Sequence, residues 1–228
     1  MRMMTGKGQW TVLPKLSILS LALLLGACSS SPTPNYYTLA TQVTPLPSSK
    51  VKVIEVLPVG LPDRINRAPM VIQDATGKSK ILENERWTST LASELRDNVS
   101  AGLQQKLGAV DRYNSGMAGG KVSYRVATDF SHFDVVTTDV ARKSMAVAVA
   151  WIVKRNDPNI TLDPNSNQNQ QLACRMSFSQ PIGGDSTSVQ DIVRVASASL
   201  GQVIDAMAVS IASLDSKVPL RIEGAVCS

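Results

Sequence analysis

Histidine is nearly absent from this sequence, which contains a single one, His132. Serine and cysteine hydrolases use a histidine as general base, and histidine-rich metal sites need several, so both classes are disfavoured. Three cysteines are too few for a zinc site built from thiolates alone. The chain also lacks a Gly-x-Gly-x-x-Gly run and a P-loop, which cradle phosphates. The sequence therefore predicts no enzyme, no metal site and no cofactor.

Clustered positive charge is lacking as well. The formal net charge is +5, from 23 basic and 18 acidic residues. Three of the basic residues, Arg2, Lys7 and Lys15, come before the first hydrophobic run, which leaves 20 against 18 in the rest of the chain. No cluster of five or more lysines and arginines follows, so we do not expect nucleic-acid binding.

The N-terminus has the layout of a secretory signal peptide. The basic residues 1–15 are followed by ten residues, LSILSLALLL at 16–25, that are almost all apolar. A transmembrane helix needs about 20 apolar residues, and a buried core helix would not account for the charged flank. A short apolar segment after a basic one is typical of a signal peptide. We therefore expect residues 1–27 to be removed.

The apolar stretch ends in Leu25-Gly26-Ala27-Cys28, which resembles the lipobox of bacterial lipoproteins. The resemblance implies that the Cys28 sulfur carries a diacylglycerol and that cleavage frees its amine for a further acyl chain. Several acyl chains anchor a protein stably, because each buried methylene contributes about 0.8 kcal/mol. Ser29, rather than aspartate, follows the cysteine, so we expect a lipid-anchored protein of the outer membrane that faces the periplasm.

Lipidation of Cys28 leaves Cys174 and Cys227 as an even pair. The periplasm permits disulfides, so we expect the two to be joined, with two free thiols as the alternative. Such a bond would attach the C-terminal tail to a predicted strand.

Serine and proline follow the lipobox and predict a tether over residues 28–50. The first part, residues 29–35, spans at most about 25 Å, so we expect the domain to lie close to the membrane. Tyr36, Tyr37 and Leu39 interrupt this polar leader with apolar side chains. They either pack on their own domain or contact a partner or a neighbouring subunit.

Hydrophobic periodicity predicts a single domain over residues 51–228. Apolar spacing of every third or fourth residue predicts helices, and runs that alternate or are rich in valine predict strands. The predicted helices cover 84–107 and 189–214, and the predicted strands lie at 51–59, 70–72, 80–82, 121–136, 144–153, 172–178 and 218–222. Their order predicts an α+β fold, a mostly antiparallel sheet with two long helices packed on one face.

Three local signals refine this prediction. Past His132 the apolar phase of the strand at 121–136 shifts, which indicates a bulge or bend. Alanines occupy one face of the strand at 144–153, where we expect a helix or another sheet to approach closely. The residues at 156–168, rich in Asn and Pro, predict a loop.

The lipobox, the segment Asn35-Tyr36-Tyr37-Thr38-Leu39 and the helical stretches 83–107 and 189–214 together resemble the PqiC-like (YmbA-like) auxiliary lipoproteins of ABC-type transport systems. The resemblance implies an outer-membrane lipoprotein that docks the periplasmic MCE-domain protein of an intermembrane lipid transport system. The permease of such a system lies in the inner membrane. The resemblance also allows a homo-oligomeric ring. The alternative is a free-standing structural or ligand-binding envelope lipoprotein with no transporter.

Overall fold

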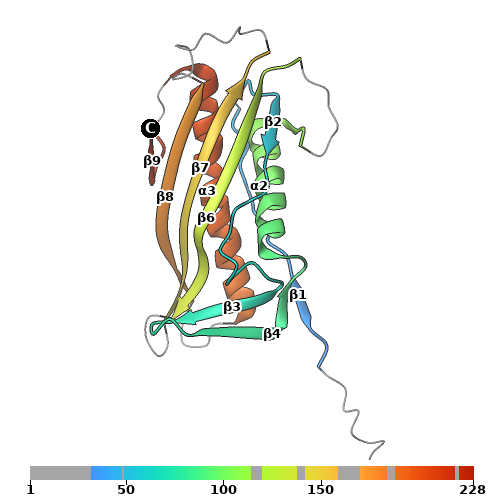
Figure 1. Ribbon diagram of the computed structural model, residues 1–228, viewed down its shortest axis with the longest axis vertical. Coiled ribbons are helices and arrows are strands. Elements are labelled where there is room, and N and C mark those ends of the chain that lie inside the picture. The colour runs from blue at the N-terminus through green and yellow to red at the C-terminus, as the bar shows by residue number, and fades with distance from the viewer. Residues whose placement is uncertain are drawn as a thin grey trace, which may run out of the picture. The chain divides into compact units, whose positions relative to one another are not determined.

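The computed structural model describes residues 32–47, 49–113, 120–137, 142–158, 170–183, 188–218 and 221–228. Cys28 and most of the loop predicted at 156–168 lie outside the described residues. Within them, Pro34–Ser228 forms one unit that contains a nine-stranded sheet and two long helices (Figure 1). The fold is α+β, and most of the paired residues of its sheet are antiparallel, as the sequence predicts.

Three long antiparallel strands form the centre of the sheet. They are β6 (Ser123–Thr137), β7 (Lys143–Asn156) and β8 (Gln171–Ile182). A register shift between Phe130 and His132 marks a β-bulge in β6, at the point where the apolar phase changes in the sequence. The bulge lets both halves of β6 turn their large apolar side chains to the same core.

Two parallel strands share the other edge of β6. β2 (Val53–Val56) pairs with the first half of β6, and β3 (Pro69–Asp74) pairs with its last residues. Between them the chain bridges to β6 at Gly60, whose N–H donates to the Thr128 carbonyl and whose carbonyl accepts from Phe130. One long strand therefore joins two separate N-terminal segments into a single sheet.

Shorter strands complete the sheet. β4 (Ser79–Trp87) forms the predicted hairpin with β3, and β1 (Asn35–Tyr37) runs parallel to the last residues of β4. β5 (Val110–Asp111) pairs with β2, and β9 (Ala225–Cys227) pairs with β8. The tail strand thus lies later than the predicted 218–222, because pairing with β8 begins only after the turn at Gly224, whose φ is 72°.

Both helices lie on one face of the sheet; in Figure 1 the longer one runs behind the three long strands, and the shorter one lies behind β2. They are α2 (Leu91–Leu107) and α3 (Val189–Ser216). The helices approach each other closely at Gly102, where a Cβ atom would lie 2.8 Å from Cδ1 of Ile204. Within the part of the chain that the structure describes, α3 is the one helix that could cross a membrane by length and composition, but 67% of the relevant window is buried inside the protein, as suits a core helix.

The first helix begins later than the sequence predicts, at Leu91 rather than near residue 84. Residues 83–87 stay in β4, where Arg86 pairs with β3 and Trp87 pairs with β1. A helix that began after a cap at Asn84 would form a few more backbone hydrogen bonds within the helix. Strand pairing on both edges of β4 provides more of them. Tertiary pairing therefore overrides the local helix signal.

The large side chains of β7 face the helices and are buried: Met145, Val147, Val149, Trp151 and Val153. Its alanines lie on the opposite face, and no helix or sheet of the described residues covers them. The prediction that a helix or another sheet approaches the alanine face is therefore wrong for the described residues. The helices pack on the face with the larger side chains, because that arrangement removes more apolar surface from water.

Candidate functional site

Part of the polar leader that the sequence predicts is built into the domain. Residues 38–46, the strap, follow β1 and run along both helices. Leu39 is 3% exposed and belongs to the hydrophobic core. The structural unit therefore begins at Pro34, ahead of the boundary at 51 that the sequence predicts.

Glu94 of α2 holds the beginning of the strap. Its carboxylate accepts hydrogen bonds from the Leu39 N–H at 3.3 Å and from the Thr38 hydroxyl at 3.1 Å. The hydroxyls of Thr88 and Ser89 donate to the other carboxylate oxygen. Glu94 is only 6% exposed, so these donors replace the water that a carboxylate requires.

Further contacts tie the strap to both helices. The Ala40 N–H donates to Oγ of Ser197 on α3 at 3.1 Å, and the Leu46 N–H donates to the Lys106 carbonyl on α2 at 2.7 Å. The Lys106 ammonium also lies 2.6 Å from Oδ1 of Asp205 on α3. The strap and this ion pair therefore join α2 to α3 along their length.

The structure separates the three residues predicted for an interface. Leu39 packs in its own core, so its assignment to a partner interface is corrected. Tyr37 is half-buried against that core, and the Glu85 carboxylate raises the pKa of its phenol, chiefly through a hydrogen bond. Tyr36 is 60% exposed on β1 and remains available to a partner.

A groove of about 860 Å³ lies beside the strap, along the exposed side of α3. Ala40 and Gln42 of the strap contribute to its lining, and so does Gln180 of β8. α3 contributes small residues, including Ala198 and Gly201. Glutamine amides both donate and accept hydrogen bonds, so this lining suits an extended or helical segment of another protein.

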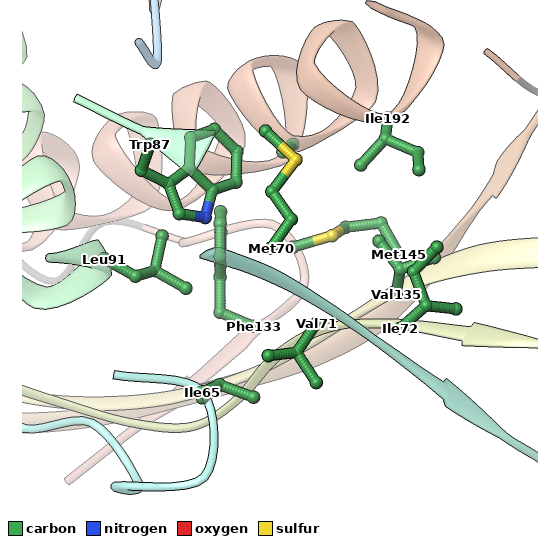
Figure 2. Close-up of a pocket in the computed structure, with 11 residues that line it drawn as sticks. Ile65, Met70, Val71, Ile72, Trp87, Leu91, Phe133, Val135, Met145 and Ile192 are labelled. Atoms are coloured by element: carbon green, nitrogen blue, oxygen red, sulfur yellow. The ribbon is translucent and has the colours of Figure 1, made fainter. Parts of the chain in front are cut away.

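A second hollow is apolar and much smaller (Figure 2). It holds about 30 Å³ between the β3–β4 hairpin, β6, β7 and the first turns of both helices. All the residues that line it have aliphatic, aromatic or thioether side chains. No side chain there supports acid–base or metal chemistry.

The two cysteines of the described chain form a disulfide. Cys174 of β8 and Cys227 of β9 stand opposite each other, with their Cα atoms 4.1 Å apart. Next to them, Ala173 and Ser228 exchange two backbone hydrogen bonds. These contacts fix the C-terminal tail to the edge of the sheet.

The charged cluster around Glu55 is structural. Arg112 and Arg125 lie 3.0 and 3.2 Å from its two carboxylate oxygens, which connects β2 to the residue after β5 and to β6. Burial alone would raise the pKa of Glu55, but hydrogen bonds from both arginines outweigh it and lower the pKa below its ordinary 4.5. The stabilisation is therefore present above pH 4.5 and is lost as the pH falls through the lowered value.

Sequence reasoning missed Glu94 and Lys106. The available signal for Glu94 was its place on the apolar side of the helix, between Leu91 and Leu95. A carboxylate at such a position needs buried donors. No group of three metal-binding side chains occurs within the described ranges, and His132 is an exposed residue beside Arg64.

These features define an α+β protein whose leader forms part of the domain and whose described residues hold no catalytic or metal constellation. The chain belongs to the family of ABC-type transport auxiliary lipoprotein components, whose model matches residues 37–208. The resemblance seen in the sequence is thereby confirmed, and with it an association with an ABC-type transport system. The match begins at Tyr37 and so includes the strap.

Two solved structures share the fold. A crystal structure of an uncharacterized protein is 19% identical with a TM-score of 0.56, and the match covers 79% of this chain and 99% of that one. A protein from Xanthomonas campestris is 13% identical with a TM-score of 0.58, covering 80% of this chain and 98% of that one. At these identities the likeness shows the fold alone. No curated protein is a significant match.

Proposed function

We propose that this protein is the outer-membrane-anchored auxiliary component of an MCE/ABC-type intermembrane lipid transport system. It docks the periplasmic MCE-domain protein at the outer membrane and is not itself an enzyme. The observation that carries the docking role is the groove beside the strap. The strap forms part of the groove and continues into the segment that leads to Cys28.

Chain length supports this role. Pro34 lies six positions after Cys28, a distance of about 20 Å at most. A partner segment bound in the groove would therefore be held near the lipid surface. The open, amide-rich lining favours a protein partner over a lipid tail, because buried amides without hydrogen-bond partners are costly.

The anchor is tested by Cys28→Ser, with Ser29→Ala as the matched control. We expect Cys28→Ser to lose the lipid and to move from the outer-membrane fraction to the soluble periplasm, because no thiol remains to be acylated. Membrane fractionation and intact-mass spectrometry report both changes. Ser29→Ala should be processed and localised normally. A Cys28→Ser protein that stays in the outer membrane contradicts the anchor.

The docking groove is tested by Ala198→Arg. This exposed residue lines the groove, and a long charged side chain there should lower co-purification with the MCE-domain protein about tenfold, as the loss of about 1.4 kcal/mol does. Ala101→Arg makes the same change at an exposed position of α2 and should leave co-purification intact. Equal recovery of both variants would place the partner elsewhere. Failure of the wild-type protein to capture it, even after crosslinking, would favour a free-standing lipoprotein.

A further inference from the structure

We propose that the apolar cavity under the β3–β4 hairpin binds the end of one acyl chain of a membrane lipid. The proposal uses the membrane anchor of the proposed function but does not depend on the docking partner. It assigns a ligand class to a cavity that the docking role leaves unused.

The lining of the cavity selects an apolar ligand. Trp87 and Phe133 form part of its wall, and Leu91 of α2 and Ile192 of α3 complete the side toward the helices (Figure 2). No charged side chain and no carboxamide or hydroxyl side chain lines it. A lipid headgroup would therefore lose its hydration without gaining partners, whereas a hydrocarbon end would lose nothing.

Two methionines make the cavity adaptable. Its free volume of about 30 Å³ holds little more than a terminal methyl or methylene group. Met70 and Met145 line it and are 4% and 2% exposed. Their unbranched thioether side chains can rearrange at low cost, so the cavity can lengthen along an entering chain.

The hairpin that covers the cavity is weakly fixed to the rest of the sheet. β3 pairs with β6 through three residues only, and its register with β4 shifts between Pro69 and Met70. The other edge of β4 is covered by the three residues of β1. Elements with so few hydrogen bonds to the remaining fold open more readily than the three long strands.

The cavity also lies at the end of the domain where the leader arrives. β1 pairs with β4, and Figure 1 shows β1 at the same end as the hairpin. Asn35 lies seven positions after Cys28, so the end of β4 that pairs with β1 stays within about 25 Å of the anchor. Lys78 and Lys80 are exposed near the turn of the hairpin and can meet lipid phosphates.

Trp87 provides an internal reporter for the test. The mature chain keeps two tryptophans, Trp87 in the cavity wall and Trp151 elsewhere in the core. The full mature lipoprotein is reconstituted in phosphatidylethanolamine and phosphatidylglycerol vesicles whose acyl chains carry bromine near the terminal methyl. In a Trp151→Phe protein we expect the Trp87 fluorescence to be quenched. In a Trp87→Phe protein the Trp151 fluorescence should persist, and equal quenching of both overturns the proposal.

Filling the cavity gives a second readout. Ala196 of α3 lines the cavity and is 1% exposed, so Ala196→Met should place a side chain where the acyl end lies and abolish the quenching of Trp87. Ala101→Met, at an exposed position of α2, should leave it unchanged. Thermal unfolding checks that each variant is folded. If Ala196→Met does not fold, the comparison of the two tryptophans decides alone.

The unanchored protein separates this proposal from the anchor itself. Cys28→Ser, mixed in solution with a brominated lysophospholipid, should still show quenching of Trp87 because the cavity is intact. Suppose that Trp87 is quenched in the Cys28→Ser protein but not in the anchored protein in vesicles. The protein's own acyl chain then occupies the cavity, which overturns the assignment to a membrane lipid. Absence of quenching in both settings overturns acyl binding while leaving the docking role standing.

Discussion

Reduction of the Cys174–Cys227 disulfide should lower the free energy of unfolding by about 4 kcal/mol. The bond joins residues 53 apart, and the loss of chain entropy in a loop of that length accounts for this value. Urea denaturation with and without reductant measures the difference. A Cys174→Ala/Cys227→Ala double variant should be as unstable as the reduced protein and should not respond to reductant.

The same experiment has a local readout. β9 has three residues, and Val226 at its centre is 64% exposed, so little apolar contact holds the tail once the disulfide is open. The Ala173 N–H, which donates to Ser228, should then exchange with solvent faster. The Val149 amide in the central strand should be unaffected. A tail that stays protected after reduction would show that the strand pairing suffices without the disulfide.

Glu94→Ala should destabilise the protein by about 3 kcal/mol, because it leaves several buried donors without an acceptor. The Leu39 N–H and the hydroxyls of Thr38, Thr88 and Ser89 all donate to this carboxylate. Chemical denaturation measures the loss, and the N-terminal strap should show faster proteolysis. The effect has a structural origin, because Glu94 ties the leader to the helix.

Two further variants serve as comparisons for Glu94→Ala. Glu94→Gln keeps one acceptor oxygen and should lose less stability than Glu94→Ala. Asp97→Ala removes a carboxylate that is 70% exposed on the same helix, and we expect a change within about 0.5 kcal/mol. If Glu94→Ala also falls within that range, the strap is held mainly by apolar contacts such as those of Leu39.

The sequence predicts the elements well where one face of each is apolar over many residues. α3, the three long strands and the bulge near His132 all follow from spacing alone, because each element buries a continuous face. Residues 83–87 were assigned to a helix because the spacing of Trp87 and Leu91 fits one. Their strand form depends on β1 and β3, which are distant in sequence, so a local pattern does not contain it.

The candidate sites also divide into those that a local motif predicts and those that distant segments form. Cys28 is predicted from a short local motif, and the pairing of Cys174 with Cys227 from the even number of cysteines that lipidation of Cys28 leaves. The groove beside the strap combines residues of the leader, β8 and α3, and no local pattern brings Gln42 near Gln180. The sequence leaves open whether Leu39 packs on its own domain or contacts a partner, because the core that covers it is formed by distant segments.

The arrangement of β6 sets the order in which the chain is assembled. The chain is synthesised from its N-terminus, yet Ile54 and Ile72 pair with residues of β6 that are made much later. The first strands must therefore wait for a nucleus of β6, β7 and β8, whose antiparallel neighbours close short loops and form faster. The Ala40 N–H donates to Ser197 of the last helix, so this early segment of the chain is among the last to be fixed in place.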